Sequence, residues 1–108
     1  MSVLKSKNIF RDIPAPLKEE FFETLQSSDN IKIERIVSYG HVTQEGEWYD
    51  QTQNEWVILL SGEAILSFLD SDDVRLKAGE YINIPAHKKH RVSWTMPEKE
   101  SVWLAIHY

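Results

Sequence analysis

The chain of 108 residues contains no cysteine. This absence excludes disulfide bonds, thiolate zinc sites, iron–sulfur clusters and cysteine nucleophiles. Metal or proton chemistry must therefore use the four histidines, the carboxylates and the tyrosine hydroxyls. Basic residues are also in the minority, because 12 Lys and Arg face 17 Asp and Glu and leave a net charge of -5. A chain of this charge lacks the basic surface that binds nucleic acid or anionic membranes, so we expect neither partner.

Long apolar runs are absent as well. The longest covers residues 56–60, far short of the roughly 20 residues of a membrane-spanning helix. The first residues contain two lysines but no apolar stretch typical of a signal peptide. We therefore expect a cytoplasmic protein, and the length is that of one domain.

The N-terminal third has a helical pattern. Leu17, Phe21, Phe22 and Leu25 are spaced to form one face of a short helix, and prolines precede them. The pattern predicts a helix over residues 16–27, within an N-terminal segment (residues 1–30) that packs on a larger unit (residues 31–108).

From residue 31 onward the pattern is that of β-strands. Short segments of alternating or continuous apolar residues are separated by Gly, Pro or Asp at intervals of roughly 8–12 residues, which is typical of a β-sandwich or small barrel. The expected strands begin at Ile31 and then cover residues 55–61, 63–69, 74–77, 81–84, 90–95 and 101–108.

Two segments have features beyond a strand pattern: residues 46–62 and residues 79–94. In the first, Glu55 opens the most apolar strand, where a carboxylate needs a partner such as a metal ion, backbone donors, or Arg35 or Arg91. In the second, a proline ends a strand and two histidines follow, His87 and His90. Alternation places His90 on one face with Val92 and Trp94.

These segments resemble the two motifs of the cupin superfamily. Six residues separate Glu55 from Gly62 and five separate Gly79 from Pro85, as in the motifs, and His90 falls on the histidine of the second motif. The resemblance implies an all-β double-stranded β-helix, or jelly roll, with a ligand cavity in its mouth. It also implies a divalent metal (Fe, Mn, Zn, Ni or Cu) held by histidines and a glutamate.

The sequence departs from the first motif, because its two histidines are missing. Trp48 and Asp50 stand at these positions with the longer family spacer, and His87 and Trp94 replace the glycine and asparagine of the second motif. With the shorter spacer the two histidine positions hold Tyr49 and Gln51. Asp50 and His87 are in turn open to a simpler interpretation as a loop acid and a solvated turn histidine. The candidate metal ligands are Asp50, Glu55, His87 and His90, suited to Fe, Mn, Zn or Ni.

The remaining aromatic residues and histidines complete the expected site. Trp48, Tyr49 and Trp94 are expected to line a substrate pocket, although the first two could pack on the N-terminal helix instead, and His107 is expected to be a catalytic proton shuttle. The resemblance implies a metal-dependent dioxygenase, isomerase or hydrolase acting on an organic acid or sugar-like molecule. The alternatives are a metal-free module that binds or senses a small molecule and, third, a structural scaffold.

One apolar face has no obvious cover. If Val57 and Leu59 face the cavity, then Trp56, Ile58 and Leu60 point outward, and a contiguous apolar patch of this kind is typical of an interface. Cupins often dimerise through one sheet, so the resemblance predicts a homodimer.

Overall fold

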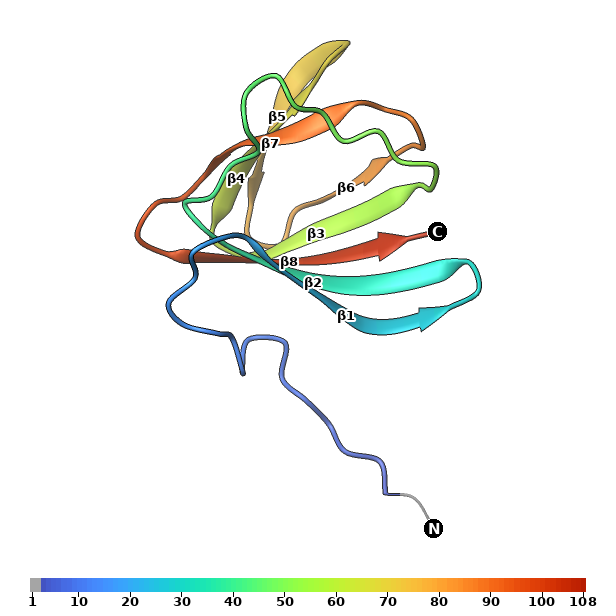
Figure 1. The fold of residues 1–108 in the computed structure, drawn as a ribbon, viewed down its shortest axis with the longest axis vertical. Coiled ribbons are helices and arrows are strands. Elements are labelled where there is room, and N and C mark those ends of the chain that lie inside the picture. The colour runs from blue at the N-terminus through green and yellow to red at the C-terminus, as the bar shows by residue number, and fades with distance from the viewer. Residues whose placement is uncertain (1–2) are drawn as a thin grey trace.

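The structure, a computed structural model, describes residues 3–108 (Figure 1). Within this range the chain forms eight β-strands in two antiparallel sheets, and it contains no helix. The strands are β1 (Phe21–Ser28), β2 (Ile31–Tyr39), β3 (Glu55–Ser61), β4 (Glu63–Phe68), β5 (Ser71–Lys77), β6 (Tyr81–Ile84), β7 (His90–Thr95) and β8 (Glu100–His107). The expected strands from residue 31 onward are confirmed, except that β5 begins three residues before the expected strand over residues 74–77.

The two sheets face each other as the layers of a flattened barrel (Figure 1). One sheet has the strand order β1-β2-β8-β3-β6 and the other has the order β5-β4-β7. Apolar side chains from the inner faces of both sheets pack between them, which removes them from water and holds the layers together. This core consists of Val57, Leu59, Ala64, Leu66, Phe68, Leu76, Ile84, Trp103 and Ala105.

The expected N-terminal helix is wrong, because residues 21–28 form β1 and pair antiparallel with β2. Phe22 and Leu25, two members of the proposed helical face, are 48% and 41% exposed and form no buried stripe. A helix of about 12 residues is marginal without such a stripe. Strand pairing instead satisfies the backbone groups along β2, which would otherwise be a free edge. No helix able to cross a membrane occurs among residues 3–108.

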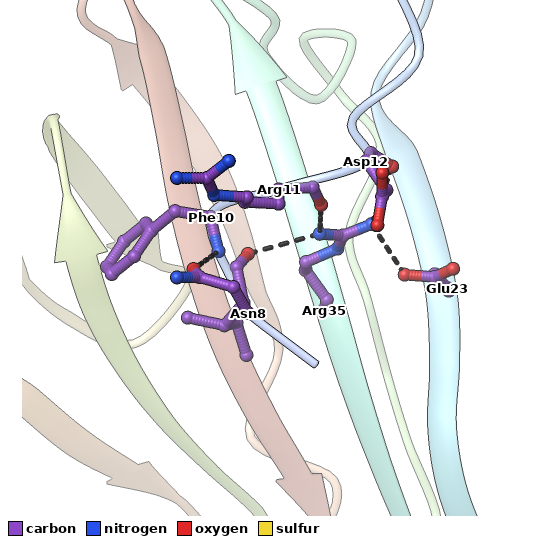
Figure 2. A network of polar contacts seen from close by, with 7 residues as sticks. Asn8, Phe10, Arg11, Asp12, Glu23 and Arg35 are labelled. Atoms are coloured by element: carbon purple, nitrogen blue, oxygen red, sulfur yellow. Dashed lines mark hydrogen bonds and ion pairs between the residues drawn. The ribbon is translucent and has the colours of Figure 1, made fainter. Parts of the chain in front are cut away.

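A buried arginine attaches the N-terminal segment to the outer face of this sheet (Figure 2). Arg35 on β2 is only 3% exposed. Its guanidinium donates hydrogen bonds to the carbonyl oxygens of Ile9 (3.1 Å), Arg11 (2.5 Å) and Asp12 (3.1 Å). The same group forms an ion pair of 2.7 Å with Glu23 on β1. One side chain therefore joins the segment before β1 to two strands.

The outward face of β3 is partly open. Val57 and Leu59 are buried in the core, whereas Trp56, Ile58 and Leu60 are half-buried on the opposite face. The Trp56 ring lies 5.2 Å from the ring of Tyr81, centroid to centroid. Dimerisation through this face stays a prediction, and sedimentation at micromolar concentration would test it.

Candidate functional site

A cavity lies between the two sheets, lined by residues from both. Its volume, counted as the space open to the centres of water molecules, is about 60 Å³. This is enough for several waters or a small organic molecule. The walls are mostly aliphatic and aromatic, and the polar groups among them are three glutamates, two histidines, a tyrosine and a glutamine. The lining residues are Glu20, Phe22, Glu34, Ile36, Tyr49, Gln51, Glu55, Val57, Leu66, Ile84, His90, Val92, Trp103 and His107.

The first polar pair in the cavity joins Glu55 to His90. These residues begin β3 and β7, and they are 8% and 5% exposed. His90 Nε2 lies 3.5 Å from Glu55 Oε1, and His90 Nδ1 lies 2.9 Å from the carbonyl oxygen of Lys88. Because a carbonyl only accepts, Nδ1 donates, and this bond turns Nε2 toward the cavity. Glu55 therefore pairs with a histidine, and the alternative pairing with Arg35 or Arg91 is not seen.

These contacts control the protonation of His90. Burial alone would lower the pKa of His90, but its hydrogen bonds to Glu55 and to the Lys88 carbonyl raise the pKa overall. The imidazole of this pair therefore takes up a proton more readily than an ordinary histidine. That is a property of groups that donate and accept protons near neutral pH.

The second polar pair joins Glu34 on β2 to His107 at the end of β8. His107 Nε2 lies 3.3 Å from Glu34 Oε1, and both residues are buried. The hydrogen bond from His107 lowers the pKa of Glu34 despite its burial, and Lys32 at 3.5 Å acts in the same direction. The two pairs are neighbours, because His107 and Glu55 lie opposite each other on adjacent strands.

Glu20, just before β1, is the third carboxylate of the cavity. The hydroxyl of Ser38 donates a hydrogen bond of 2.7 Å to Glu20 Oε2. Burial raises the pKa of Glu20, and this effect outweighs the lowering by Ser38 and His41. Glu20 is thus a carboxylate without a cationic hydrogen-bond partner in the described residues.

The structure divides the four expected metal ligands. Glu55 and His90 lie in the cavity, but Asp50 and His87 pair with each other outside it, with 2.9 Å between Asp50 Oδ1 and His87 Nδ1. Their side chains are 44% and 66% exposed. Across residues 3–108, no group of three or more His, Asp or Glu side chains is arranged to hold a metal ion. The donor set present therefore does not fit the metal that the motif resemblance implies.

The expected pocket aromatics are divided in the same way. Tyr49 lines the cavity, and its ring lies 5.6 Å from the His90 ring. Trp48 and Trp94 do not line it; each ring instead lies against an arginine, Trp48 against Arg91 at 5.7 Å and Trp94 against Arg75 at 5.2 Å.

A β-bulge explains the position of Trp94. Val92 on β7 pairs with Leu66, which is buried in the core, but Trp94 pairs with Ile65 on the other face of β4. The register shift between Ile65 and Leu66 breaks the strict alternation of β7. His90 and Val92 therefore face the cavity, and Trp94 does not.

Two cavity carboxylates, Glu20 and Glu34, were not expected from the sequence. Glu34 alternates with Ile33 in a pattern that predicts an outward side chain, yet it faces the cavity. The pattern misleads because both faces of β2 are covered, the inner by the other sheet and the outer, at Arg35, by the N-terminal segment. The signal in the sequence that both faces of β2 are covered was a charged residue on each face, Glu34 on one and Arg35 on the other.

Glu20→Gln tests the environment of this carboxylate. Because the pKa of Glu20 is higher in the folded than in the unfolded chain, its ionisation costs stability as pH rises above the ordinary value of 4.5. Glutamine does not ionise and still accepts the Ser38 hydrogen bond. We expect a higher Tm than wild type at about pH 8 and an equal Tm at about pH 4. Glu19→Gln, at the exposed neighbouring residue, is the control; a lower Tm of E20Q at both pH values would contradict the assignment.

Titration of the His90 ring by NMR tests the first pair. We expect its pKa above 6.5, and Glu55→Gln should lower it because the hydrogen bond to the cationic ring weakens. The pair should contribute stability below pH 6.5 that is lost as pH rises through the raised value. Glu63→Gln, which removes the partner of Arg75, should leave the titration unchanged. An identical His90 titration in wild type and E55Q would show that the pair is not formed.

A family model for the cupin domain matches residues 36–107. This range includes most of the barrel and three of the four residues in the two polar pairs, all but Glu34. The chain belongs to the cupin family. This assignment confirms the family resemblance seen in the two motifs. A search of curated proteins returned no significant match.

Solved cupin structures share the fold. A protein of Ralstonia eutropha JMP134, described as a candidate mannose-6-phosphate isomerase, is 39% identical over 96% of this chain and 97% of its own, with a TM-score of 0.90. An RmlC-like cupin of Methanocaldococcus jannaschii with a double-stranded β-helix fold is 16% identical over 89% and 85% of the two chains, with a TM-score of 0.70. A cupin-2 domain protein of Shewanella frigidimarina is 19% identical over 83% and 81%, with a TM-score of 0.64. The last two establish the jelly roll alone.

Proposed function

We propose that this cupin binds a small organic molecule in the cavity between its sheets, at the two imidazole–carboxylate pairs. The observation that carries the proposal is the placement of Glu55–His90 and Glu34–His107 side by side in an otherwise apolar cavity. Buried charged groups cost free energy unless they are paired, and a fold does not need two such pairs for its own stability. A cavity with apolar walls and a few convergent polar groups is typical of a small-molecule site.

Binding at these pairs does not require a metal. Only Glu55 and His90 of the four expected ligands lie in the cavity, so we derive no step through a metal ion. Elemental analysis of the purified protein tests the alternative directly. Stoichiometric Fe, Mn, Zn or Ni that is lost in both Glu55→Gln and His90→Ala would show that this cupin holds its metal through these residues.

A titration followed by NMR tests the proposed site. Glycolaldehyde, 1,2-propanediol and mannose would be added while the ring signals of His90 and His107 are recorded. We expect at least one compound to shift these signals, and His90→Asn and Glu55→Gln to weaken its binding about tenfold, since each removes a charged hydrogen-bond partner. Asp50→Asn and His87→Asn are matched controls, because they change the same chemistry outside the cavity. Equal losses in all four variants would contradict the site.

A second candidate function is isomerisation of a hydroxy-carbonyl compound. It is supported by the 39% identical Ralstonia protein, described as a candidate isomerase, and by the raised pKa of His90. In such a reaction one group takes a proton from the hydroxyl-bearing carbon beside the carbonyl while another protonates the carbonyl oxygen, which gives an enediol. The hydroxyl on the first carbon then gives up its proton as a proton is delivered to the former carbonyl carbon, so that the carbonyl moves by one carbon and both protein groups regain their starting protonation. His90 and His107 would fill these roles, each oriented by its glutamate. Deuterium uptake from D₂O by mannose, lost in H90N, would support this function; no uptake would exclude it for this compound.

A further inference from the structure

The charges around the cavity restrict the ligand further. Of the described residues, three carboxylates and two imidazoles line it, but no lysine or arginine does. The lining also comes from both sheets, so an entering molecule meets these groups from several strands at once.

The cations that reach these carboxylates are already in use. His90 is paired with Glu55, and Lys32 outside the lining lies 3.5 Å from Glu34 Oε2. Among residues 3–108, Glu20 receives a hydrogen bond only from the neutral hydroxyl of Ser38. An anion in this cavity would therefore find no free lysine or arginine in the part of the chain that the structure describes, and it would lose its hydration, which is costly in a buried, weakly polar site.

The remaining surface favours a neutral molecule with a hydrocarbon body. Val57, Leu66 and Ile84 supply apolar wall, whereas the carboxylate oxygens supply hydrogen-bond acceptors. A hydroxyl group donates to such oxygens without bringing a charge. It also accepts a hydrogen bond in turn from a protonated imidazole.

We propose that the cavity selects an uncharged, hydroxyl-bearing molecule with a hydrocarbon body, and rejects organic acids and phosphate esters. This inference rests on the proposed function and specifies its ligand class. Of the two ligand types expected from the sequence, an organic acid or a sugar-like molecule, it favours the second. It also means that a phosphorylated sugar would have to keep its phosphate outside the cavity.

Three compounds with one carbon skeleton test this proposal: 1,2-propanediol, lactate and 1-amino-2-propanol. They differ only in one terminal group, which is neutral, anionic or cationic at about pH 8. Binding would be followed by the ring signals of His90 and His107 and by the indole N–H of Trp103, which lines the cavity and has no protein acceptor among residues 3–108. We expect millimolar binding of the diol and at least about tenfold weaker binding of lactate.

Charge-neutralising variants test whether the cavity carboxylates cause the weaker binding of lactate. Glu34→Gln frees Lys32, and Glu20→Gln removes a carboxylate while leaving its hydrogen bond with Ser38, so each should shift the preference toward lactate by about tenfold. Glu19→Gln, at an exposed site, should not.

The outcomes distinguish the proposed ligand class from the proposed binding of a small molecule. Lactate binding as tightly as the diol overturns the charge selection but leaves small-molecule binding intact. Tightest binding of 1-amino-2-propanol shows that the site selects cations and overturns the neutral class. If none of the three compounds shifts any cavity signal, the ligand class proposed here is overturned; if glycolaldehyde and mannose also fail, the proposed function falls with it.

Discussion

Gly62→Ala is expected to destabilise the protein by about 2–5 kcal/mol. Gly62 connects β3 to β4 at the corner between the two sheets, with a φ of +88°. A Cβ there would clash with Ser101 Oγ and would lie 2.7 Å from both Ser101 Cα and Ser101 Cβ. The left-handed backbone costs roughly 1–2 kcal/mol for alanine, and overpacking against backbone adds roughly 1–3 kcal/mol. Urea unfolding would measure the loss.

Other glycines separate these two costs. Gly79 has a φ of +92° and Gly46 a φ of +89°, but nothing lies within 4 Å of a Cβ at either position. Gly79→Ala and Gly46→Ala should therefore lose only the backbone part. Adding Ser101→Gly to G62A should recover part of the steric loss, because the contact with Ser101 Cα remains. Equal losses at all three glycines would show that the corner is not tightly packed.

Arg35→Met is expected to destabilise the protein by about 2–3 kcal/mol and to release the N-terminal segment. The variant removes three hydrogen bonds to carbonyl oxygens and the ion pair with Glu23, all from a side chain that is almost fully buried. Hydrogen bonds to charged groups contribute roughly 1.5–3 kcal/mol each when buried, and water compensates for part of this loss at the exposed segment. Arg35→Lys should rescue little, since one ammonium cannot reach all four partners.

Two measurements check this prediction. Urea unfolding gives the stability, and trypsin cleavage after Arg11 reports on the segment, which should be cut faster in R35M. Arg75→Met is the control, because Arg75 is 56% exposed and its ion pair with Glu63 is of the surface kind, which contributes at most about 1 kcal/mol. Unchanged cleavage in R35M would mean that Arg35 does not hold the segment.

The barrel was predictable from the sequence because its signals are local. Each strand from Ile31 onward has its own apolar pattern, and each except β8 is followed within two residues by Gly, Pro or Asp. Glu55 and His90 were identified as a site because both match ligand positions in the cupin motifs that the sequence resembles. By contrast, β1 is decided by the free edge of β2 some ten residues later, and this long-range pairing leaves no trace in the periodicity of residues 16–27.

The rest of the site depended on geometry that no local pattern contains. His87 follows Pro85 in a turn with a φ of +64°, and its side chain points to Asp50 rather than to His90. Trp94 alternates with Val92 in the sequence, but the bulge in β7 moves it to the other face. Glu34 was not expected in the site, because the cover on the outer face of β2 comes from a segment with no strand pattern.

The length of β3 sets the position of Glu55 in the pocket. Its seven residues run from Glu55 at one end of the barrel to Ser61, next to the Gly62 corner at the other, a distance of about 20 Å in an extended strand. The spacing between the motif glutamate and glycine thus sets how far the carboxylate stands from the closed corner. Inserting or deleting one residue in β3 would turn the glutamate to the outside, so depth and orientation of the site are encoded by a single interval.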